Sequence, residues 1–158
     1  MIVSIFLAEK SGGTVRGVTD AKVVEGKGFS EDRNFGQADY PGQNVTLIES
    51  EAVARFNSEH RQSIEPRDTR RNIVTTGVDL NALVGRDFSI GQVRFRGIEL
   101  CTPCAFLGES LENESMSRAQ VVKAFVTSGG LRADVLSSGT IAVGMTIDTG
   151  TCLLYTSP

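Results

Sequence analysis

The side chains best suited to chemistry in this sequence are two cysteines separated by two residues, Cys101 and Cys104. Thiol chemistry needs the thiolate form, and positive or polar neighbours lower the pKa of a thiol from roughly 8.5. Three arginines stand upstream in the chain, at Arg67, Arg70 and Arg71. The sequence therefore raises the question of whether folding brings these guanidinium groups close to the cysteine pair.

A C-x-x-C pair allows several functional interpretations. A structural zinc site needs two further ligands, and the sequence offers only Cys152 and His60, so we disfavour zinc. A dithiol redox switch usually sits in a βαβ context, which we do not find here. A single reactive cysteine acting as a sulfur carrier or metal ligand is the third reading. The alternative without function is that both cysteines are small buried hydrophobic residues.

The basic cluster extends from Arg61 to Arg71. We predict a strand over residues 69–75, and a strand points alternate side chains to opposite faces. Arg70 and Asn72 would then share one face. The planar guanidinium suits phosphate or carboxylate, and the amide of Asn72 adds both a donor and an acceptor. Solvated surface charge is the usual alternative for such a run.

Two further segments are weaker candidates. Lys10 and Ser11 precede Gly12-Gly13, and exposed backbone amides with a Lys and a hydroxyl can cradle an anion. Most segments of this kind are only turns. The pair Asp32-Arg33, taken alone, indicates a surface ion pair of little energetic weight.

Composition sets limits on the class of protein. The chain has 158 residues, 40% hydrophobic and 22% charged, which suits one globular domain. The net charge of −3 argues against a general nucleic-acid binder. Three cysteines are too few for a secreted disulfide framework, and no apolar run approaches the length of a membrane span. We therefore expect a cytoplasmic protein that contacts neither nucleic acid nor membrane.

The pattern of apolar residues and turns predicts a mainly β fold. We expect about eight strands and two real helices, with the helices over 49–59 and 118–127. The strands do not alternate strictly with helices, which favours a barrel with peripheral helices over a doubly wound sheet. The strands are expected at 2–8, 21–25, 44–48, 69–75, 88–90, 93–100, 131–136 and 140–147. Residues 151–158 are expected to be a non-native or disordered tail.

Three stretches together carry a resemblance. They are Arg70-Arg71-Asn72-Ile73-Val74, then Gly77 to Gly85, then Cys101-Thr102-Pro103-Cys104, and the closing segments 131–135 and 139–144 add to them. On these motifs the chain resembles the MOSC domain, named for the molybdenum cofactor sulfurase C-terminal region, over nearly all of residues 2–147. The resemblance implies a β-barrel of the pyruvate-kinase type in a domain spanning residues 1–150.

The resemblance also implies a site. The reactive cysteine of the family corresponds to Cys104, as molybdenum ligand or as persulfide sulfur carrier. The molybdenum cofactor would be bound by Lys10, Ser11, Arg33, Arg70 and Asn72. Family members often have Gly before the Asp-Arg pair, whereas this chain has Glu31, whose carboxylate would oppose an anion unless it turns away.

Partners and activity follow from the same resemblance. Some MOSC domains are fused to a pyridoxal-phosphate sulfurase, which is missing here, so a cysteine desulfurase or other sulfur donor would act in trans, with a possible redox partner. An enzymatic role would be that of a sulfur transferase or a component of a molybdenum-dependent reductase. A non-catalytic cofactor-binding module and a Cys101/Cys104 redox switch stay open as alternatives.

Overall fold

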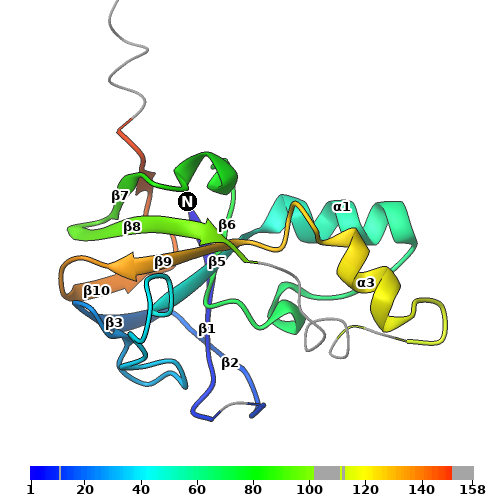
Figure 1. The fold of residues 1–158 in the computed structure, drawn as a ribbon, viewed down its shortest axis with the longest axis horizontal. Coiled ribbons are helices and arrows are strands. Elements are labelled where there is room, and N and C mark those ends of the chain that lie inside the picture. The colour runs from blue at the N-terminus through cyan, green and yellow to red at the C-terminus, as the bar shows by residue number, and fades with distance from the viewer. Residues whose placement is uncertain (11, 102–110, 112, 151–158) are drawn as a thin grey trace, which may run out of the picture.

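The computed structural model describes residues 1–10, 12–101, 111 and 113–150. Within this part of the chain the fold is mainly β, as predicted, with a curled sheet and two α-helices beside it (Figure 1). The strands are β1 Ile2–Leu7, β2 Arg16–Val18, β3 Asp20–Val24, β4 Gly28–Phe29, β5 Val45–Glu49, β6 Ile73–Thr75, β7 Asp87–Ile90, β8 Val93–Leu100, β9 Leu131–Val135, β10 Gly139–Ala142 and β11 Ile147–Asp148. The α-helices are α1 Ser50–His60 and α3 Arg118–Ala124, and two 3₁₀ helices are η1 Pro66–Thr69 and η2 Leu80–Leu83.

The strands form a half-barrel. Eight of them make one sheet in the order β11-β7-β8-β9-β5-β6-β1-β2, and β10-β3-β4 make a small second sheet. The pairing of β5 with β6 is parallel, whereas β1 with β6, β5 with β9 and β8 with β9 are antiparallel. Because β1 and β6 run in opposite directions, the end of β1 and the residues before β6 meet at one end of the sheet.

The interior of the half-barrel is the larger of two apolar clusters. It gathers side chains from nearly every strand, including Phe29, Phe95 and Ile141, which are fully buried. The rings of Phe88 and Phe95 stack with their centroids 5.4 Å apart. Each such side chain contributes about 1.5–3 kcal/mol by leaving water, so this cluster holds the strands in their registers.

The second apolar cluster joins the helices to the outer face of the sheet. Ala52, Val53 and Phe56 recur at helical spacing on α1 and are buried. The ring of Phe56 stacks on Phe125 at the end of α3, with centroids 4.6 Å apart. In Figure 1 the two helices accordingly lie beside one another on one side of the sheet.

The predicted capping box of α3 is confirmed. The Ser117 hydroxyl accepts a hydrogen bond from the Gln120 backbone N–H, and the Gln120 side chain accepts one from the Ser117 N–H. The helix ends at Ala124 and not at the predicted 127.

Two strand predictions need correction, and two short strands were missed. The expected strand over 69–75 begins only at Ile73, because Pro66 starts a 3₁₀ turn and Arg70 takes a left-handed conformation with φ 62°. The expected strand over 140–147 is two strands, β10 and β11, since Gly144 at φ 95° turns the chain between them. The short strands β2 and β4 were not predicted, because neither carries an alternating apolar pattern.

None of the helices in the described part of the chain has the length and apolar character that a membrane crossing requires.

Candidate functional site

Three segments meet at the end of the sheet where β1 finishes. Ile5 pairs with Ile73, so the residues after Leu7 lie next to those before β6. The loop that follows β4 joins them there, because the Arg33 backbone N–H donates to the Ala8 carbonyl oxygen at 2.7 Å. The Ala8 N–H in turn donates to Asp32 Oδ1 at 3.0 Å. One backbone–backbone and one backbone–side-chain hydrogen bond thus fix segments that are far apart in sequence to each other.

Asp32 is a buried carboxylate in this cluster. Its side chain has 0% exposed area and accepts from the N–H groups of Ala8 and Asn34 and from Arg33 Nη1, the last at 3.1 Å. The sequence alone indicated a surface ion pair at Asp32-Arg33, and that interpretation is wrong. A carboxylate with several hydrogen bonds and one close cation holds the guanidinium of Arg33 in a defined place.

Arg33 also reaches the arginine cluster. Its Nη2 atom donates to the Arg70 carbonyl oxygen at 3.0 Å. Arg70 caps η1 in the left-handed region, at φ 62°, with its N–H bonded to the Arg67 carbonyl oxygen. Positive φ is uncommon outside glycine. In this conformation Arg70 ends the 3₁₀ turn, and its carbonyl oxygen accepts the hydrogen bond from Arg33 Nη2.

Burial lowers the pKa of Arg70, and the positive charge of Arg33 lowers this pKa further, whereas Asp32 opposes the shift. The direction shows that the two guanidinium groups lie close enough to repel each other in a partly desolvated place. Asp32 forms an ion pair with Arg33 and also acts electrostatically on Arg70. Guanidinium groups bind oxyanions through paired N–H donors, so two neighbouring arginines suit an anion.

Asn72 is fully buried and holds three strands together. Its Oδ1 accepts from the Thr46 N–H at 3.1 Å and from the Thr46 hydroxyl at 3.3 Å, and its Nδ2 donates to the Phe6 carbonyl oxygen at 3.2 Å. These bonds connect the start of β6 to β5 and β1. Asn72 therefore fixes the backbone from which Arg70 and Arg71 project, and its contact with a cofactor stays a prediction.

The predicted Lys-Ser pair lies close in sequence to this cluster. Lys10 is exposed in a turn closed by a hydrogen bond from the Gly13 N–H to the Lys10 carbonyl oxygen, at 2.9 Å. Ser11 lies outside the described residues. The turn follows Ala8, whose carbonyl oxygen binds the Arg33 N–H. The binding roles of Lys10 and Ser11 stay predictions.

Glu31, the departure from the family pattern, is charge-compensated. Its carboxylate forms an ion pair with Arg16 on β2 at 3.0 Å, and its side chain is 68% exposed. An exposed pair of this kind is worth little to stability. Its effect on the site is electrostatic, since a neighbouring cation offsets the negative charge beside Asp32-Arg33. No signal in the sequence identified Arg16 as the partner.

The cysteine pair begins at the end of β8. Cys101 is 1% exposed, and its N–H donates to the Gly130 carbonyl oxygen at 2.7 Å. Gly129, the residue before Gly130, accepts a hydrogen bond from Arg71 Nε at 2.9 Å. Two consecutive glycine carbonyls therefore link the Arg70–Asn72 segment to Cys101. Cys104 lies outside the described residues, so its distance from Arg70 stays a prediction.

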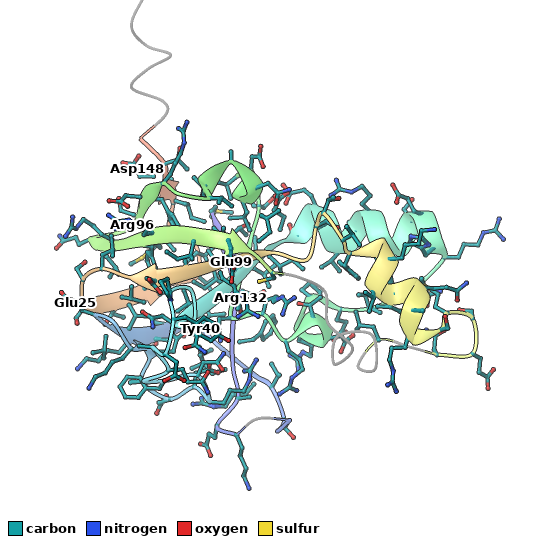
Figure 2. All side chains as sticks on the ribbon, viewed as in Figure 1. Glu25, Tyr40, Arg96, Glu99, Arg132 and Asp148 are labelled. Atoms are coloured by element: carbon teal, nitrogen blue, oxygen red, sulfur yellow. The ribbon has the colours of Figure 1, made fainter. Side chains whose placement is uncertain are left out.

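A separate hollow of about 440 Å³ lies between the 38–41 loop and β9. Figure 2 labels two of its lining residues, Glu25 and Tyr40, and Asp39 and Asp134 also line it. Three carboxylates without a lining cation make this hollow unsuited to an anion. The described residues contain no group of three His, Cys, Asp or Glu side chains that could hold a metal ion.

Comparison with known proteins concerns the family and the fold of the chain. The sequence model of the MOSC domain matches residues 15–148. A comparison with curated protein sequences gives no match.

Solved structures share the fold at low sequence identity. YuaD from Bacillus subtilis superposes with a TM-score of 0.80 at 16% identity, covering 93% of this chain and 94% of that one. YiiM from Geobacillus stearothermophilus gives a TM-score of 0.69 at 15% identity, over 94% of this chain and 73% of that one. YiiM from Escherichia coli gives 0.67 at 14% identity, over 93% and 68%. At these identities the likeness establishes the fold.

Proposed function

Because this chain belongs to the MOSC domain family, we propose that it binds the molybdenum cofactor, or a related anionic pterin or metal–sulfur species, and that Cys104 serves as sulfur carrier or molybdenum ligand. The family is associated with molybdenum cofactor functions. The residues assigned to the site are Lys10, Ser11, Arg33, Arg70, Asn72 and Cys104.

The observation that carries the proposal is the pair of cations at Arg33 and Arg70. Both side chains are partly buried, Arg33 pairs with the Asp32 carboxylate, and the Arg33 guanidinium donates to the Arg70 carbonyl oxygen. At an effective dielectric constant near 20, a phosphate oxygen about 4 Å from one guanidinium gains about 4 kcal/mol of attraction. The negative charge of a phosphate-bearing pterin would offset the repulsion between the two cations. Water carries no net charge and offsets this repulsion less well.

The donor set fits the anionic part of the cofactor. Arginine offers forked N–H donors that match phosphate geometry. A thiolate is a soft ligand suited to a metal–sulfur centre, which is the role given to Cys104. When bound, the cofactor would supply a redox-active metal with sulfur ligands.

The protein's own residues would act as follows. Asp32 orients Arg33, and Asn72 fixes the backbone beside Arg70. Nearby positive charge lowers the pKa of a thiol, so the arginines would favour the thiolate of Cys104. As sulfur carrier, this thiolate would attack the terminal sulfur of a donor persulfide, forming a new S–S bond and releasing the donor as its thiolate. The donor would be a cysteine desulfurase acting in trans.

The alternatives differ in turnover. A non-catalytic module would hold the cofactor but show no turnover. Turnover is assayed with a cysteine desulfurase, or with N-hydroxylated bases and a reductase. A Cys101/Cys104 redox switch would need an accessible Cys101, yet that residue is 1% exposed, so the geometry favours the role of Cys101 in packing.

The test compares the wild-type protein with Cys104→Ala and Cys101→Ala, each produced in a host that makes the molybdenum cofactor. Bound molybdenum and persulfide sulfur are measured per chain. We expect Cys104→Ala to lose at least one of the two signals and Cys101→Ala to keep both. A Cys104→Ala protein that retains both as well as the wild type contradicts the assignment.

A further inference from the structure

We infer that Arg71 is an additional anion-binding residue of this site and contacts the bound ligand through its Nη2 atom. The inference rests on the proposed anion site. The family resemblance assigns Arg70 and Asn72 and passes over the residue between them. Because β6 begins only at Ile73, strand alternation does not decide which way the side chain of Arg71 points.

The guanidinium of Arg71 is held at one edge. Its Nε atom donates to the Gly129 carbonyl oxygen at 2.9 Å. Because β5 lies between β6 and β9 in the sheet, the side chain must cross the intervening strand to reach this carbonyl. Its direction is therefore defined before any ligand arrives, which lowers the entropic cost of binding.

The guanidinium has a second donor, beside the Nε–H, that is not used. The Nη2 atom of Arg71 is buried and has no hydrogen-bond partner among the described residues. Arg71 also forms no ion pair with a carboxylate in that part of the chain. Buried polar groups are nearly always bonded, and a charged one left unbonded costs more than a neutral one. An acceptor supplied by an anionic ligand would remove this cost.

Arg71 lies between the two halves of the proposed site. Arg70, its neighbour in the chain, is bonded to Arg33 through its carbonyl oxygen. On the other side, Gly129 is followed by Gly130, whose carbonyl oxygen binds the N–H of Cys101. An elongated anion extending from Arg33 and Arg70 towards the cysteine end would therefore pass Arg71. The expected ligand is an extended molecule that carries phosphate or a similar oxyanion.

Gly130 adds a steric argument. A Cβ atom at this position would collide with the Leu47 carbonyl oxygen and lie 3.6 Å from Arg71 Nε. The 3.6 Å separation is an ordinary van der Waals distance, so the Arg71 guanidinium lies against this turn. In the planar guanidinium, Nη2 lies on the same edge as the Nε–H that is bonded to Gly129.

The experiment uses the full chain and inorganic pyrophosphate, an elongated anion that accepts hydrogen bonds at both ends. Calorimetric titration at low salt compares wild type with Arg71→Gln. Glutamine can still donate to the Gly129 carbonyl but lacks the charge and the second donor. Arg94→Gln, at an exposed position on β8, is the matched control for charge loss. Arg70→Gln tests the anion site itself.

We expect Arg71→Gln to weaken binding about tenfold or more, the effect of losing a hydrogen bond to a charged group. Arg94→Gln should stay within about twofold of wild type, as expected for a distant charge in salt solution. The binding constant of Arg71→Gln should also depend less on salt, which a purely structural residue would not cause. The melting temperature should change little.

The outcomes separate this inference from the proposed function. If Arg70→Gln weakens binding but Arg71→Gln behaves like Arg94→Gln, Arg71 is not a ligand residue while the anion site stands. If the wild type does not bind pyrophosphate, both proposals fail. If Arg71→Gln is poorly folded, Arg71→Lys replaces it. A folded Arg71→Lys protein with wild-type affinity and salt dependence contradicts a role for the second N–H donor.

Discussion

Replacing Asn72 with alanine separates a structural role for this residue from a ligand-binding one. The side chain has no exposed area and bonds to the Thr46 N–H, the Thr46 hydroxyl and the Phe6 carbonyl oxygen. Alanine leaves the backbone donor of Thr46 and the backbone acceptor of Phe6 buried without these partners. We therefore expect Asn72→Ala to destabilise the fold strongly.

The size of the loss follows from the two groups left unbonded. Each buried unsatisfied group costs about 1–3 kcal/mol, so together they give about 2–6 kcal/mol. For a chain of this length, a loss of about 4 kcal/mol lowers the melting temperature by about 8–16 °C. Urea unfolding gives the free energy and thermal unfolding the temperature. Thr46→Val should show strong coupling to Asn72→Ala in a double-mutant cycle, because the two side chains share a hydrogen bond.

Asn81→Ala is the matched control. Asn81 is exposed and makes one hydrogen bond, from its Nδ2 to the Thr127 carbonyl oxygen at 2.9 Å, so we expect a change within about 0.5 kcal/mol. The reasoning is refuted if Asn72→Ala unfolds like Asn81→Ala yet no longer binds pyrophosphate. That pattern would make Asn72 a ligand residue without a structural function.

Two further predictions concern stability. Gly130→Ala should give little folded protein in a solubility and circular dichroism assay, because φ is 113° and a Cβ would meet the Leu47 carbonyl oxygen; a stable variant contradicts the geometry. Glu49 and Glu51 should show opposite pH dependence. Burial raises the pKa of Glu49, so its stabilising effect is lost as pH rises through that pKa, and Glu49→Gln should be neutral or stabilising at pH near 7. Hydrogen bonding by the Gly77 N–H lowers the pKa of Glu51, so Glu51→Gln should destabilise near pH 7, and the deficit should shrink as pH falls through that pKa. Melting curves at several pH values test both, and parallel curves would contradict the assignment.

The sequence predicted most of the fold because its strongest patterns are local. The alternation of buried and exposed residues in β8, from Val93 to Gly97, and the capping box at Ser117 are local signals that the tertiary structure preserves. The strand expected at 69–75 failed because the left-handed turn at Arg70 is held by contacts with Arg33, which are distant in sequence.

The site was predicted less completely, and the reason is burial. Asp32 resembled a surface charge, since nothing near it in sequence shows that the Ala8 N–H will bond to it. The pairing of Glu31 with Arg16 and the reach of Arg71 to Gly129 likewise depend on which strands become neighbours. The family resemblance predicts Arg33 and Arg70 as cofactor-binding residues, and that role stays a prediction. The repulsion between them became visible only from the folded arrangement.

The most direct test of the central claim is the amount of molybdenum and pterin that remains bound to Arg70→Gln, compared with wild type and Arg94→Gln, after purification from a cofactor-producing host. Loss of both from Arg70→Gln, in a protein that melts like the wild type, is the result we predict. Wild-type amounts bound to Arg70→Gln, or none bound to the wild type, would contradict the claim that this pair of arginines holds the cofactor.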